Sequence, residues 1–62
     1  MNWTGWAWLS SERMTIGVDV RDGVVVRTPP IARIFVGQKY ELLRRWMEKQ
    51  PGFEGIESGI AW

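Results

Sequence analysis

The sequence predicts a small α+β domain, an antiparallel sheet with one amphipathic helix packed on one face. From Met14 to Arg21, apolar residues alternate with polar residues or glycine, which is the pattern of a half-buried strand. Further along, Tyr40, Leu43 and Met47 recur at the three- and four-residue spacing of a helix with an apolar stripe. We therefore expect the order β-β-β-α, with a further strand possible after the helix.

The 62 residues are enough for one small domain, and composition divides them into three segments. A tryptophan-rich arm covers residues 1–9, and a scaffold made of the hairpin and the helix covers residues 14–50. A glycine-rich tail with an aromatic end covers residues 51–62. The scaffold is expected to hold the protein together. Its contacts are expected from the arm and tail, or from the outer sheet face around Asp19, Val25 and Arg27.

The arm reads as a strand that is apolar on both faces. Alternation places Trp6 and Trp8 on one face and Trp3, Ala7 and Leu9 on the other. A strand of this kind lies in the centre of a sheet or at an interface, because both of its faces need cover.

The turn at Asp22-Gly23 allows two hairpin registers, which differ in the side chains that share the buried face. With a two-residue loop, Val20 pairs with Val25 and Val18 pairs with Arg27. That register places an arginine among the core valines.

A three-residue loop over residues 21–23, with Gly23 in the left-handed conformation, instead pairs Val20 with Val24 and Val18 with Val26. We predict this register, because a slip of one residue turns every side chain to the wrong face. Its buried face consists of Ile16, Val18, Val20, Val24 and Val26.

The double proline at 29–30 ends the second strand and suits the first turn of a helix, with Thr28 as the expected N-cap. Residues 31–36 are expected to form a short helical turn. The main helix is expected to begin at residue 38 or 39 and to stop at Pro51-Gly52.

In the tail, Ile56, Ser58, Ile60 and Trp62 alternate with other residues, and three glycines disfavour a helix. We expect this segment to pack as an edge strand or across a neighbouring subunit.

Charge and residue types exclude several functions. Eight basic and seven acidic residues are mixed along the chain, which is not the basic excess of a dedicated DNA-binding protein. The chain has no Cys and no His, which removes disulfides and the usual zinc sites. With no catalytic motif, membrane span or signal peptide recognisable, we expect a cytoplasmic, non-enzymatic protein without a cofactor.

Five tryptophans are more than so small a monomer is expected to cover. One buried tryptophan removes roughly 200 Å² from water, which stabilises by about 5 kcal/mol before entropy costs. We therefore expect a homo-oligomer that associates through its aromatic arms. The candidate interface or ligand contacts are Trp3, Trp6, Trp8, Arg21, Arg27, Arg33, Arg45 and Trp62.

The same residues allow a second hypothesis, a nucleic-acid or nucleotide (second-messenger) binding module. Trp6 and Trp8 would stack on bases, while phosphates would be contacted by Arg13, Arg21 and Arg27. Arg44 and Arg45 on the helix, with Arg33 before it, would form a small anion site. A solvated helix face is favoured there, because Glu41 and Glu48 neutralise both helix arginines. The core or interface role is favoured for the tryptophans, because the chain has little else from which to build a core.

The run DGVVVRTPPIARIFVGQ at residues 22–38, followed by LLRRW at residues 42–46, resembles short uncharacterised open reading frames of phages and prophages. The resemblance covers roughly residues 14–50. It implies an accessory protein that binds and blocks, or sequesters, a host component in the host cytoplasm. It assigns no activity and no functional residue.

Overall fold

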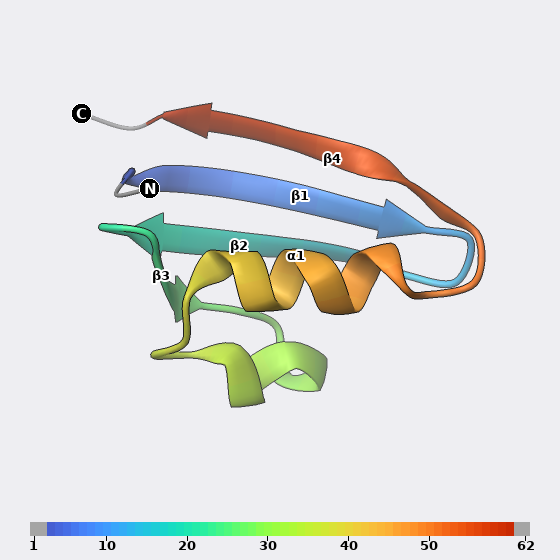
Figure 1. Ribbon diagram of the computed structural model, residues 1–62, viewed down its shortest axis with the longest axis horizontal. Coiled ribbons are helices and arrows are strands. Elements are labelled where there is room, and N and C mark those ends of the chain that lie inside the picture. The colour runs from blue at the N-terminus through green and yellow to red at the C-terminus, as the bar shows by residue number, and fades with distance from the viewer. Residues whose placement is uncertain (1–2, 61–62) are drawn as a thin grey trace.

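A computed structural model, which describes residues 3–60, shows a four-stranded antiparallel sheet with its helices on one face (Figure 1). The strand order is β3-β2-β1-β4, and the predicted α+β class is confirmed. In chain order the elements are β1 (Gly5–Ser11), β2 (Thr15–Arg21), β3 (Val24–Arg27), the 3-10 helix η1 (Pro30–Phe35), α1 (Tyr40–Glu48) and β4 (Phe53–Ile60).

Strand β1 lies in the centre of the sheet, as its two apolar faces predict. Leu9 pairs with Ile16 of β2 on one side and with Ile56 of β4 on the other. Ala7 and Leu9 are fully buried, whereas Trp6 and Trp8 are not. The alternation expected for the arm is therefore confirmed, and its apolar side faces α1.

The predicted hairpin register is wrong. Val20 pairs with Val25, and Arg21 pairs with Val24, around a two-residue turn. Both turn residues have positive φ, 56° at Asp22 and 77° at Gly23, as a type I′ turn requires. Aspartate and glycine tolerate this conformation better than most residues, so the tighter turn carries little strain.

In this register a bulge keeps Arg27 away from the core valines. The pairing shifts between Val20 and Asp19, so that Val26 is skipped and Arg27 lies opposite Asp19 instead of Val18. The arginine therefore meets a carboxylate, and not the core. The valine that is buried on β3 is Val25, whereas Val24 is half-buried and Val26 is exposed.

The short helical turn is present as η1, but Thr28 does not cap it. Pro29 occupies the N-cap position without any side-chain hydrogen bond, and the hydroxyl of Thr28 is buried without a partner. Proline is also the first residue of the helix, where it offers no N–H to a cap. The first turn closes through Ala32, whose N–H donates to the carbonyl of Pro29 at 3.0 Å.

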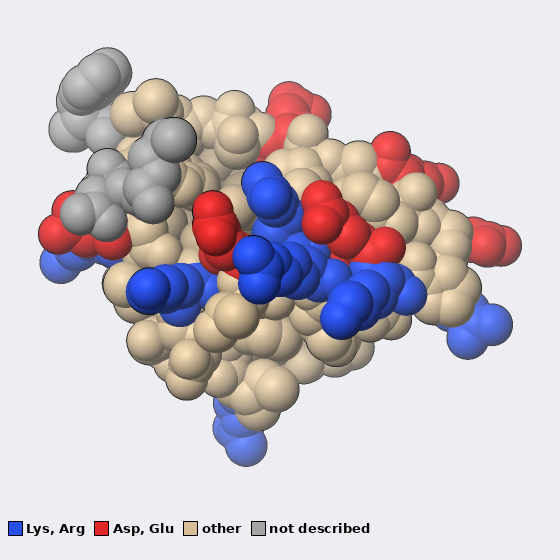
Figure 2. Space-filling view, viewed as in Figure 1, with Lys and Arg blue, Asp and Glu red and all other residues tan. Residues whose placement is uncertain are grey.

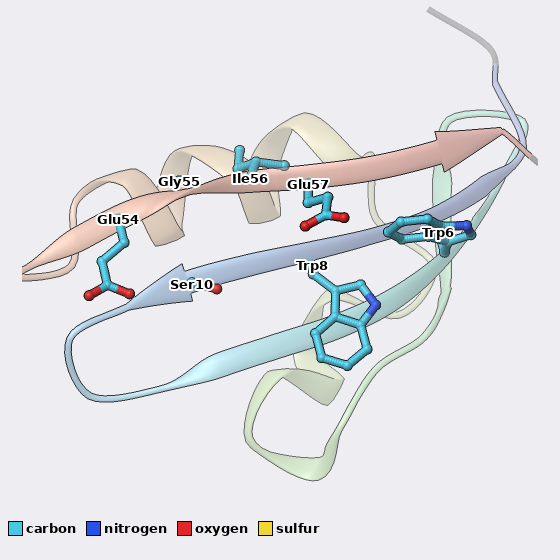
Figure 3. Close-up of a pocket in the computed structure, with 7 residues that line it drawn as sticks. All are labelled: Trp6, Trp8, Ser10, Glu54, Gly55, Ile56 and Glu57. Carbon is cyan, nitrogen blue, oxygen red and sulfur yellow. The ribbon is translucent and has the colours of Figure 1, made fainter.

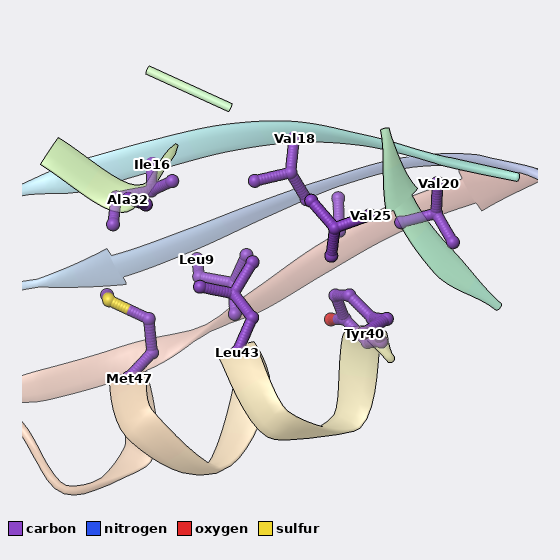
Figure 4. Packing of buried hydrophobic residues seen from close by; sticks show 10 residues of the cluster. Leu9, Ile16, Val18, Val20, Val25, Ala32, Tyr40, Leu43 and Met47 are labelled. Atoms are coloured by element: carbon purple, nitrogen blue, oxygen red, sulfur yellow. The ribbon is translucent and has the colours of Figure 1, made fainter. Parts of the chain in front are cut away.

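Helix α1 places the predicted stripe on the sheet. Tyr40, Leu43 and Met47 are buried, whereas Leu42 lies on the outer side and is 44 % exposed. Figure 4 shows the stripe pointing at the side chains of the strands. The core consists of Ala7, Leu9, Ile16, Val18, Val20, Val25, Ala32, Tyr40, Leu43 and Met47.

The tail forms the edge strand β4, which confirms one of the two expectations for it. Its partner is β1, from Gly5 opposite Ile60 to Ser11 opposite Phe53. A bulge near Ser10 interrupts the first part of this pairing. Trp62 lies outside the described residues.

Candidate functional site

Among residues 3–60, no helix lies on the face of the sheet that is turned away from α1, and we call this face the open face. Strand alternation and register assign its residues. They are Trp6, Trp8 and Ser10 of β1, Thr15, Gly17, Asp19 and Arg21 of β2, Val24 and Arg27 of β3, and Gly55, Glu57 and Gly59 of β4.

The two tryptophans of the open face lie against glycines of the neighbouring strands. A Cβ atom on Gly59 would lie 2.6 Å from two carbons of the Trp6 indole. A Cβ atom on Gly17 would lie 3.6 Å from the nearest atom of Trp8. Trp6 therefore extends towards β4 and Trp8 towards β2, and Figure 3 shows Trp8 lying over β2. The glycines provide the space in which the indole rings rest on the sheet.

Much of the aromatic surface remains open to solvent. Trp6 is 38 % exposed and Trp8 is 55 % exposed. Because one side of each ring rests on a strand, the opposite side is available to a ligand. Tryptophan in this arrangement offers a large, rigid contact surface at little cost in conformational entropy.

A shallow hollow of about 420 Å³ lies between these tryptophans and the first half of β4 (Figure 3). Trp6, Trp8 and Ser10 line it together with Glu54 and Glu57, both of which are exposed. Gly55 and Ile56 complete the lining. Aromatic faces beside carboxylates attract cations, because ring quadrupole and carboxylate charge act in the same direction.

Basic side chains lie at another part of the open face, near the β2–β3 hairpin. Arg27 forms an ion pair with Asp19 at 3.7 Å, and Arg21 follows Asp19 on the same side of β2. The Asp19 carboxylate reduces the positive charge that this region offers to a phosphate. The predicted group of Trp6, Trp8, Arg21 and Arg27 thus shares one face, but its arginines lie apart from the hollow.

Apart from Trp62, which is outside the described residues, the remaining predicted contacts lie in the helical layer, on the far side of the sheet. Trp3 packs edge-to-face against Tyr40, with ring centroids 5.2 Å apart, and is half-buried. Arg33 is exposed on η1 and Arg45 is exposed on α1. These three residues do not join Trp6 and Trp8 in one site.

The helical layer also holds most of the positive charge. Residues 30–50 contain five basic and two acidic side chains, whereas the rest of the chain contains three basic and five acidic ones. Figure 2 shows Lys and Arg side chains gathered over α1. On α1, Arg44 pairs with Glu48 at 3.8 Å. The pKa of the Tyr40 hydroxyl is raised, mainly because the side chain is buried. The positive charge of Arg44 lowers this pKa, and the negative charge of Glu48 raises it.

Sequence reasoning missed the residues of β4 that complete the site. Glu54 and Glu57 line the hollow, and Gly59 supports Trp6. The alternation of the tail was visible, but nothing in it showed that β1 would be its neighbour. The alternation of residues 14–21 likewise did not show that Gly17 would support Trp8.

Comparison with protein-family models, curated proteins and solved structures found no match to this chain. Among residues 3–60, no three or more His, Cys, Asp or Glu side chains cluster so as to hold a metal ion. Over the same residues, neither helix has the length and apolar character needed to cross a membrane.

Proposed function

We propose that this chain is a non-enzymatic binding protein whose open face takes up a segment of another protein. The observation that carries the proposal is the pair of exposed indoles, Trp6 and Trp8, held against the sheet by Gly59 and Gly17. Exposed aromatic surface on a rigid strand is typical of the anchor points of protein interfaces.

The hollow suggests what the partner contributes. Glu54 and Glu57 stand beside Trp6 and Trp8, so the complementary group is a lysine or arginine side chain with an apolar stem. Its charged end would meet the carboxylates while its stem covers an indole. The resemblance to phage open reading frames makes a host protein the expected class of partner.

The charge distribution disfavours the nucleotide hypothesis. Phosphates would be repelled by Glu54 and Glu57 at the hollow, and Arg33 and Arg45 lie in the opposite layer. The arginines that share the open face, Arg21 and Arg27, flank Asp19. Stacking by the tryptophans would therefore lack the electrostatic attraction on which most nucleic-acid binding depends.

Capture from a bacterial lysate tests the proposal. The tagged wild-type chain is expected to retain a defined set of proteins, and Trp8→Ala is expected to lose them because it removes the more exposed indole. Glu57→Gln is expected to weaken retention by removing one carboxylate of the hollow. Ile34→Ala is the matched control, since Ile34 is 77 % exposed on η1, away from the open face.

The result that contradicts the proposal is equal retention by the wild type, Trp8→Ala and Ile34→Ala. A parallel titration with single-stranded oligonucleotides at low salt follows tryptophan fluorescence. Strong quenching that is lost in Trp8→Ala would replace the protein-binding proposal with the nucleic-acid one.

A further inference from the structure

The two edges of the sheet differ in whether their backbone groups are paired. At β3, the outer edge is closed by the segment that leads into α1. The N–H of Val25 donates to the carbonyl of Gln38 at 2.9 Å, and the N–H of Gly37 donates to the carbonyl of Val25 at 2.8 Å. This arrangement protects one edge from pairing with another chain.

The edge at β4 is open. Within residues 3–60 no strand lies beyond β4, and residues 54–60 make no backbone hydrogen bond outside their ladder with β1. An edge of this kind presents a row of unpaired N–H and C=O groups, whose natural complement is another strand. The first part of β4 is irregular, with a bulge near Ser10 and a φ of 148° at Gly55. The regular stretch runs over residues 56–60.

We propose that β4 pairs antiparallel with β4 of a second copy of this chain, around a two-fold axis at Ser58. The sheet would then continue through a symmetric dimer. This interface uses the outer edge of β4 and shares Ile56 with the lining of the hollow, but its formation does not depend on the function proposed above. The sequence predicts self-association through the aromatic arms, whereas in this dimer the chains would associate through the backbone edge of β4.

The side chains favour this position of the axis. With the axis at Ser58, each Ile56 lies opposite Ile60 of the second copy, and each Glu57 lies opposite Gly59. Ile56 and Ile60 are 37 % and 62 % exposed at the edge of the helix-covered side, so the pairing covers apolar surface that is now open.

The neighbouring axis position is disfavoured. With the axis at Glu57, the two Glu57 carboxylates would stand directly opposite each other, which destabilises a strand pair. Ile56 would then lie opposite Ser58 instead of another isoleucine. Charge and apolar surface therefore select the same register.

The dimer would also add a group to the candidate site. The register places Glu57 of the second copy beside Gly59, on which the Trp6 indole rests. Each open face would thereby gain a carboxylate on the Trp6 side. Self-association would use the outer edge of β4, and partner binding would use the open face next to that edge.

A single introduced cysteine tests the register, because the natural chain has none. In Ser58→Cys the two thiols would face each other across the axis. Facing Cα atoms of antiparallel strands are about 4.5 or 5.5 Å apart, a separation that a disulfide spans. Glu57→Cys is the control, since its two thiols would be offset. Under mild oxidation, Ser58→Cys is expected to form a disulfide dimer at least about tenfold faster than Glu57→Cys, because pairing raises the effective concentration of the thiols.

Sedimentation velocity of the unmodified chain completes the test. We expect a concentration-dependent dimer that is lost in Ile60→Lys, with the circular dichroism of the fold retained. A monomer at every concentration, or equal crosslinking of the two cysteine variants, overturns the proposal. A dimer lost in Trp8→Ala but kept in Ile60→Lys also overturns it. Crosslinking of Ser58→Cys together with failed lysate capture would refute only the proposed function.

Discussion

Gly59, against which the Trp6 indole lies, offers a test of how the tryptophans of the open face are held. In Gly59→Ala the added Cβ would lie 2.6 Å from two indole carbons, so the indole must move. Trp6 is 38 % exposed, and the covered remainder corresponds to roughly 120 Å², or about 3 kcal/mol of burial if the contact were lost entirely. Because part of that contact survives a tilt of the ring, we expect Gly59→Ala to lower the free energy of unfolding by about 1–3 kcal/mol.

The same substitution at the other supporting glycine is the matched control. In Gly17→Ala the new Cβ would lie 3.6 Å from Trp8, an ordinary van der Waals separation. Alanine in a strand is favoured over glycine by roughly 0.5–1 kcal/mol, so this variant is expected to be neutral or slightly more stable. Neither glycine has a positive φ that would exclude alanine.

A double-mutant cycle identifies the cause. In a Trp6→Ala background the clash is absent, so Gly59→Ala is expected to become neutral or stabilising. Urea unfolding followed by far-ultraviolet circular dichroism measures all the variants without relying on tryptophan fluorescence. Equal effects of Gly59→Ala in the two backgrounds, or equal effects of Gly59→Ala and Gly17→Ala, would refute this account of how Trp6 is held.

Three further predictions concern the core, the pH dependence and the surface. Leu43→Ala is expected to cost about 2–5 kcal/mol in urea unfolding, whereas Leu42→Ala on the outer side of α1 should cost less than about 1 kcal/mol. Similar costs at these adjacent positions would contradict the packing of the helix. Burial raises the pKa of Tyr40 above 10.0, so the folded state holds the phenolic proton more tightly than the unfolded state does. The free energy of unfolding should therefore fall as pH rises above 10.0, and less steeply in Tyr40→Phe; parallel profiles would argue against this contribution. Asp19→Asn is expected to change the free energy of unfolding by less than about 1 kcal/mol, because its ion pair with Arg27 is solvent-exposed. A larger loss in urea unfolding would contradict this interpretation of the pair.

The elements that the sequence predicted best are those whose pattern lies within one segment. The alternation of β2 and the stripe at Tyr40, Leu43 and Met47 are periodic in themselves, and the structure buries the expected side chains. The hairpin register was harder, because it depends on one skipped residue. Val26 forms a bulge that places Arg27 opposite Asp19, whereas an unbroken ladder with the same tight turn would place Arg27 opposite Val18.

The candidate site required information that no single segment contains. The sequence placed Trp6 and Trp8 on one face, but the support that holds them comes from Gly17 and Gly59 on two different strands. Only the strand order β2-β1-β4 brings those glycines beside the tryptophans. The predicted arginines lie in two different layers, Arg21 and Arg27 on the open face and Arg33 and Arg45 on the helices. The sequence did not show which face each of them would occupy.

The position of β1 at the centre of the sheet has a consequence for how the chain folds. Leu9 pairs with Ile16 across a short turn but with Ile56 only after the hairpin, both helices and the connecting loops have been traversed. Closing that long loop costs more entropy than forming the local hairpins, so we expect the β1–β4 pairing to limit the folding rate. During synthesis β4 also emerges last of the described elements. Until β4 pairs with it, β1 is an edge strand of an incomplete sheet, and it carries the exposed side chains of Trp6 and Trp8.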